Sequence, residues 1–308
     1  MIGLNWWRRI GLVVGIVASV GIVSGCEFNM DNLRNSSQVK ATQSDSEKET
    51  WRVFKFYLAA TNEFNFTSVK YSHQHMETVQ QAQQNVPLAE FKVRDYERLE
   101  QELIAARKAG HTHSDLEAAT DDLLPVLHDV VVAVKELDTY YKEKRYESDN
   151  YAFAHTQLEK LSSLIEAFGP KYNALDTIVK IYHKQEGERL VKLMRNNGQT
   201  NGANMAEMML IYSDIVNHIV VHKSDSDFQW VKAQKEAADG VGAKITAAEA
   251  QNRLEQKKHL DKAIEDFMAN PSSETEETVV EQYNEMVRSP MNFVLLDSVQ
   301  KPYVPQEL

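Results

Sequence analysis

The chain has 308 residues, with 34 basic and 45 acidic side chains, a formal net charge of −11 and one cysteine. This charge excludes a nucleic-acid groove, which needs a basic surface, and the single cysteine excludes an internal disulfide. The length is enough for one large domain or two small ones.

The first 25 residues have the organisation of a secretory signal. Two arginines, Arg8 and Arg9, precede an apolar run over 10–23, which at roughly 14 residues is too short for a membrane span of about 20. The run ends in Val-Ser-Gly-Cys at 23–26, which resembles a lipobox, the recognition site of the lipoprotein signal peptidase. We therefore predict cleavage between Gly25 and Cys26 and lipidation of the Cys26 thiol, with palmitate-like acyl chains that anchor the protein in a membrane.

The residues after the cysteine predict where the anchored protein is carried. Glu27 stands where an aspartate resembles an inner-membrane retention signal, so we expect an envelope protein on the periplasmic face of the outer membrane. Residues 26–48 are mostly polar and predict a flexible tether. The remaining body is acidic, which keeps it away from anionic lipid headgroups.

The rest of the chain predicts an all-α fold. Only seven glycines follow Cys26, whereas a β-rich protein of this length needs many turn residues. Helix-forming residues and end signals indicate helices over 49 to the low eighties, 94–109, 114 to about 141, 150–195, 203–222, 228–268 and 273–288. The helix over 228–268 either continues through Gly240 and Gly242 or breaks there. We therefore expect an elongated bundle of about six to seven helices with long antiparallel pairs, occupying residues 49–290 and followed by a C-terminal tail over 291–308.

Two of these helices carry a 3.5-residue repeat, which is typical of helices that pack side by side at a shallow angle. Ser114 and Glu117 fit a capping box at the start of the first, and its repeat is Leu123, Leu127, Val130, Val134, Leu137 and Tyr141. The second repeat is Ala154, Leu158, Leu161, Ile165, Phe168, Tyr172, Leu175, Val179 and Tyr182. Its register continues through Gly169-Pro170, so we expect one long helix that kinks there.

The turn between these two helices resembles the YiiG-like bacterial lipoproteins. The stretch 138–146 reads DTYYKEKRY and is followed by DNYA at 149–152, with His155 in the next helix. The stretch YLAATN at 57–62 is similar to the opening helix of that family. The resemblance covers roughly residues 50–290; it implies an all-helical fold and an envelope location, and it implies no catalytic residue.

Four tyrosines of this turn form the main candidate recognition surface: Tyr140, Tyr141, Tyr146 and Tyr151. Such rings either line a groove for a partner or ligand, or pack at the edge of a core with their hydroxyls at the surface.

The ten histidines raise the alternative of a metal site. His218 and His222 lie four apart on a predicted helix, a common spacing of zinc ligands. His111 and His113 lie in a predicted loop, and His73 and His75 lie in a predicted helix that points them apart. His183 and Glu186 are similar to a motif of imelysin-type proteins, but Ile181 replaces its glycine, and we expect a surface pair.

The sequence contains no nucleophile elbow, phosphate loop or dinucleotide fingerprint. We therefore expect a non-enzymatic binding protein that uses no cofactor and no metal, with an envelope protein or ligand as its partner. The alternative is a periplasmic protein that handles a metal such as iron through His111, His113, His183 or the His218/His222 pair.

Overall fold

The computed structural model describes residues 45–246 and 250–288. These residues form helices and the loops that join them and contain no strand, which confirms the all-α prediction. The α-helices are α4 (Asp45–Lys70), α5 (Ser72–Gln83), α6 (Tyr96–Lys108), α7 (Ser114–Lys142), α8 (Tyr146–Asp149), α9 (Ala152–Asn196), α10 (Thr200–His222), α11 (Phe228–Gly242), α12 (Gln251–Ala269) and α13 (Ser273–Arg288). The predicted signal peptide, the lipidated Cys26 and the tail over 291–308 lie outside the described residues.

The described part of the chain thus has ten α-helices, so the predicted count of six to seven was wrong. The predicted first helix is two helices, because it is interrupted at Tyr71. Just before the interruption, the Thr67 hydroxyl bonds to the carbonyl oxygens of Glu63 and Phe64 at 2.9 and 3.1 Å, and such back-bonding weakens a helix. The predicted sixth helix divides into α11 and α12, and α8 is a short additional turn.

The first helix also begins earlier than predicted. α4 starts at Asp45, so the last four residues of the expected tether, 45–48, are helical. Glu47 lies in its first turn, where acidic side chains stabilise the positive end of the helix dipole.

Within the range 49–290 that the sequence predicts as one helical domain, the structure distinguishes two compact units. The first is Asp45–Lys180 and the second contains the described residues from Ile181 onward. α9 begins in the first unit and ends in the second, and it passes through Pro170 without a break.

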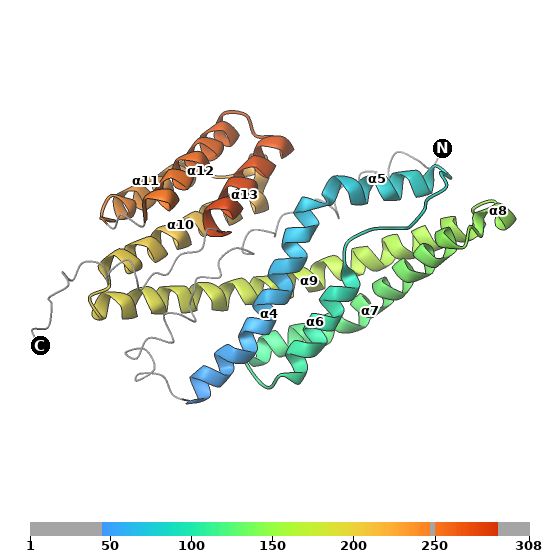
Figure 1. The fold of residues 1–308 in the computed structure, drawn as a ribbon, viewed down its shortest axis with the longest axis horizontal. Coiled ribbons are helices and arrows are strands. Elements are labelled where there is room, and N and C mark those ends of the chain that lie inside the picture. The colour runs from blue at the N-terminus through green and yellow to red at the C-terminus, as the bar shows by residue number, and fades with distance from the viewer. Residues whose placement is uncertain (1–44, 247–249, 289–308) are drawn as a thin grey trace, which may run out of the picture. The chain divides into compact units, whose positions relative to one another are not determined.

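In the first unit, α7 and the adjoining part of α9 form a helical hairpin that turns at α8 (Figure 1). Lys171 pairs with Asp122 and Lys160 pairs with Glu136 across the hairpin, which is the pattern of antiparallel neighbours. α6 packs on α4 and on α7. The repeats predicted the core of this hairpin well: among their members only Val134, Ile165 and Tyr182 are half-buried, and the others are buried.

In the second unit, α10 packs on α11 and α13, and α12 packs on the same two helices. α10 is the most buried helix here: its predicted core face is 0–1 % exposed and consists of Met205, Met208, Met209, Tyr212, Ile215 and Ile219. Its sulfur atoms are in close contact with neighbours, since the Arg253 Nη1 donates to Met209 Sδ at 3.1 Å. At Gly242 a Cβ would lie 3.2 Å from Met208 Sδ, so α11 approaches α10 closely at that glycine.

Candidate functional site

The structure brings the four predicted tyrosines together at the α7–α8–α9 turn. The ring of Tyr140 contacts that of Tyr141, with centroids 5.3 Å apart and an edge-to-face orientation. Tyr146 stacks on Tyr151, with centroids 5.1 Å apart and planes 9° from parallel. Tyr141 and Tyr146 are 6.0 Å apart, so the two pairs form one continuous cluster of rings.

Asp149 holds this turn in place. Its Oδ1 accepts hydrogen bonds from the Tyr140 hydroxyl at 2.6 Å and the Tyr151 N–H at 3.0 Å, and its Oδ2 accepts from the Phe153 N–H at 3.1 Å. The Tyr140 hydroxyl is the main reason that the pKa of Asp149 is lowered from its usual value. The carboxylate therefore satisfies free N–H groups at the start of α9 and ties that helix to the end of α7.

The backbone of the turn has an unusual conformation. Lys144, Asn150 and Tyr151 have φ angles of 53°, 50° and 65°, in the left-handed region that side chains other than glycine disfavour. Near the same turn, the His155 Nε2 donates to the Asn85 Oδ1 at 2.7 Å, and Asn85 also has a positive φ of 59°. Strained backbone of this kind persists only where surrounding contacts over-determine it.

The four rings are not equally available to a partner. Tyr140 and Tyr141 are 1 % and 0 % exposed, and burial raises the pKa of the Tyr141 hydroxyl to about 12. Tyr146 and Tyr151 are half-buried. The predicted surface of four tyrosines is therefore reduced to the stacked pair Tyr146–Tyr151, with Tyr140 and Tyr141 as the core that supports it.

An open groove lies beside the tyrosine turn. Its lining residues come from α7, the turn and the start of α9: Val132, Lys135, Glu136, Thr139, Arg145 and Phe153. Phe153 stacks on Tyr140 with centroids 5.1 Å apart, which connects the groove to the ring cluster. Val132 is 36 % exposed, so the groove presents apolar surface next to two cations.

Removal of the Tyr140 hydroxyl tests how much its hydrogen bond to Asp149 stabilises the turn. We expect Tyr140→Phe to lower the free energy of unfolding by about 1.5 kcal/mol, because the hydroxyl of this buried ring bonds to a carboxylate. The matched control is Tyr146→Phe, since that half-buried ring keeps its stacking, and its stability should stay within about 0.5 kcal/mol of the parent. Urea unfolding of both variants measures the difference; equal stabilities would contradict this stabilisation.

The predicted histidine pair on α10 does lie side by side. The rings of His218 and His222 have centroids 4.4 Å apart, and His218 also lies 4.5 Å from Trp230. The Asp227 N–H donates to the His218 Nε2 at 3.0 Å, so the nitrogen that usually binds a metal at this spacing is engaged by the backbone. Burial lowers the pKa of His218.

The other histidine candidates have separate surroundings. His111 is exposed, with its Nδ1 3.4 Å from the Glu117 carboxylate, whereas the ring of His113 lies 6.0 Å from that of Phe54. His183 was expected at the surface but is buried, at 5 % exposure. Glu186 accepts two hydrogen bonds from the Arg189 guanidinium. Within residues 45–246 and 250–288, no three side chains of the kinds that bind metals gather in one place.

A buried polar network that the sequence did not indicate joins α4 to α9. The Asn65 amide donates to the Asp176 Oδ1 at 2.8 Å and accepts from the Tyr172 hydroxyl at 2.6 Å. Lys180 pairs with Asp176 at 3.0 Å. Burial raises the pKa of Asp176, and the nearby Lys180 and Asn65 oppose that rise. The only signal in the sequence is that Asp176 shares a helix face with Tyr172 and Val179.

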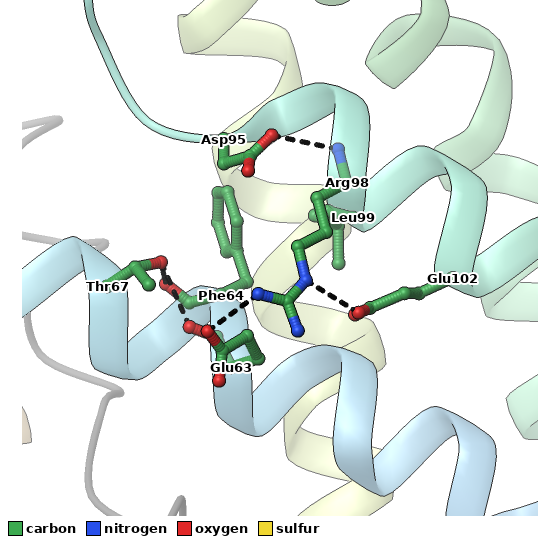
Figure 2. A pocket seen from close by; sticks show the side chains of 7 residues that line it. All are labelled: Glu63, Phe64, Thr67, Asp95, Arg98, Leu99 and Glu102. Carbon is green, nitrogen blue, oxygen red and sulfur yellow. Dashed lines mark hydrogen bonds and ion pairs between the residues drawn. The ribbon is translucent and has the colours of Figure 1, made fainter.

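A small pocket between α4 and α6 is lined by one arginine, Arg98, and by three acidic side chains. Figure 2 shows Arg98 reaching from α6 toward the acids Glu63 and Glu102, with which it pairs at 2.9 and 2.8 Å. Asp95 accepts a hydrogen bond from the Arg98 N–H and caps α6. The one cation of the pocket is thus paired with two of the three carboxylates that line it.

Comparisons with protein-family models, with curated proteins and with solved structures found no match to this chain. The similarity to YiiG-like lipoproteins therefore stays a prediction from the residues of the turn and the first helix. Among the helices that the structure describes, none is both long enough and apolar enough to cross a membrane.

Proposed function

We propose that this chain is a lipoprotein of the bacterial envelope, anchored through Cys26 in the outer membrane, whose helical body binds an envelope protein or ligand and catalyses no reaction. The lipobox-like segment 23–26 supports the anchor. The YiiG-like residues of 138–155 support the class of protein. The elongated bundle with long antiparallel pairs that the sequence predicts is part of the same proposal.

One structural observation carries the binding role. Tyr146 and Tyr151 present a stacked, half-exposed pair of rings beside an open groove. The pair is held rigidly, since Asp149 and the left-handed residues around it fix the turn. Tyrosine rings that are immobilised before binding lose little entropy on binding and are enriched in protein interfaces.

The anchor and the binding surface are tested separately. Intact-mass analysis of the natural product should show a chain that begins at Cys26 and carries acyl groups, and a free thiol with residues 1–25 attached would overturn the anchor. For the surface, a photo-reactive phenylalanine derivative replaces Tyr146 in intact cells. We expect a discrete crosslinked product that mass spectrometry identifies.

The matched control for the crosslink is the same derivative at Tyr71, another partly exposed tyrosine, at 40 % exposure. The product should form from position 146 and not from position 71, and Tyr151→Ser should reduce its yield. Absence of a product at 146, or the same products at both positions, would count against the tyrosine turn as the binding surface.

Metal handling remains the second candidate, and the observation in its favour is the adjacent pair of His218 and His222 rings. Metal analysis of the purified chain discriminates it from the first. A bound transition metal that is lost in His222→Gln would favour this role, and metal-free protein with no thermal shift on adding zinc, copper or iron would exclude it.

A further inference from the structure

The first unit contains a buried arginine, Arg94, that forms no ion pair with any residue the structure describes. Arg94 is 7 % exposed, and its Nη2 has no hydrogen-bond partner in the described part of the chain. Its guanidinium lies over the Phe64 ring, 5.8 Å from the centroid. A buried cation in this position is costly unless an anion neutralises it, because an aromatic face supplies only part of the lost hydration.

Two acids of the first unit, Asp95 and Asp176, form hydrogen bonds with other donors. Asp95, the next residue along the chain, accepts from the Arg98 N–H. Asp176 is bonded to Asn65 and Lys180. These two carboxylates therefore do not satisfy the Arg94 guanidinium, and its Nη2 keeps no hydrogen-bond partner among the described residues.

A histidine that is influenced by the charge of Arg94 lies nearby and is itself uncharged at neutral pH. His75 on α5 has a buried Nδ1 that also has no hydrogen-bond partner among the described residues. Burial, together with the charges of Arg94 and Lys92, lowers the pKa of His75 to about 4. Two unsatisfied nitrogen groups, one of them permanently charged, thus lie near each other in a chain whose overall charge is −11.

We propose that Arg94, together with His75, binds a small oxyanion, a carboxylate or a phosphate group, between α4, α5 and the segment that precedes α6. The planar guanidinium fork matches two oxygens of either group. Tyr96 and Phe64 wall the site, since both rings are buried and 5.5 Å apart. This site is distinct from the tyrosine turn, and it does not depend on the proposed envelope role.

The test is a thermal-unfolding titration of the full chain with sodium phosphate and, separately, with sodium acetate. Ionic strength is held constant with sodium chloride, so that general screening is subtracted. The parent should show a saturable rise in Tm with at least one of the two anions, and the more effective one identifies the group that is bound. No saturable response to either anion would overturn the proposal.

Two variants assign the effect to Arg94. Arg94→Met should abolish the rise in Tm, and its Tm without anion should equal or exceed that of the parent because an uncompensated buried charge has been removed. Arg94→Lys should retain folding and weaken the anion by about tenfold or more, since an ammonium lacks the fork. Arg98→Met, at the paired arginine of Figure 2, is the matched control and should keep the parental response. A response that persists in Arg94→Met would refute the assignment.

Discussion

Replacement of Asn65 by leucine should lower the free energy of unfolding by about 3 kcal/mol. The variant removes the donor to the buried Asp176 carboxylate and the acceptor of the Tyr172 hydroxyl at once. A buried polar group that loses its partner costs about 1–3 kcal/mol, and more if it is charged. Leucine has the same branched shape and the same number of side-chain heavy atoms as asparagine, so no cavity forms and the loss comes from the missing hydrogen bonds.

The pH dependence of this loss provides a second readout. Burial already raises the pKa of Asp176 in the folded chain, so the carboxyl group favours folding most at low pH, and this contribution is lost as pH rises through the folded-state pKa. Without the Asn65 amide that pKa rises further. The deficit of Asn65→Leu should therefore be larger at pH 7.5 than at pH 4.5.

Urea unfolding at both pH values measures the effect. The control is Asn62→Leu, a half-buried asparagine on the same helix, which should change stability by about 0.5 kcal/mol or less. A deficit below about 1 kcal/mol for Asn65→Leu would show that the network is dispensable.

His75 should make the protein sensitive to acid. Its pKa is about 4 in the folded chain against an ordinary value of 6.5. The unfolded state therefore binds more protons between pH 6.5 and 4, and stability is lost as pH falls through that range. Allowing for partial exposure, we expect acidification from pH 7 to pH 4 to cost the parent about 2–3 kcal/mol more than it costs His75→Gln.

The comparison requires buffers without phosphate, which we propose to interact near this residue. His128→Gln serves as the control, because His128 is exposed and pairs with Glu100 on the surface. It should keep the parental slope of stability against pH. If His75→Gln lost stability as steeply as the parent, the buried histidine would not be the source of the acid sensitivity.

The fold class and the core were predictable because they depend on short-range periodicity. The repeats ending at Tyr141 and Tyr182 identified the buried faces of α7 and α9 from spacing alone. Helix ends were less accurate. The expected capping box of Ser114 and Glu117 was wrong: His113 occupies the cap position without a side-chain cap bond, and Glu117 accepts from the Thr112 N–H.

The sequence predicted which tyrosines gather at the α7–α8–α9 turn, but it did not predict which of them are exposed. Four tyrosines near one turn indicate an aromatic cluster, but the sequence does not show which of two adjacent rings on α7 faces inward. Both Tyr140 and Tyr141 are buried, because α9 and the segment containing Phe91 cover them from different sides. Asn65 bonds to residues 107 and 111 positions away, and the ring beneath Arg94 is 30 positions away, so local patterns carried no information about these contacts.

The buried methionines of α10 provide a way to measure how often the second unit opens. A thioether that is oxidised becomes polar and no longer fits an apolar core. Met205, Met208 and Met209 are shielded from solvent, so peroxide reaches their sulfur atoms only when the helices around α10 separate transiently. The rate at which these three residues gain oxygen therefore measures the frequency of that separation, and each oxidation event would keep the unit from closing again.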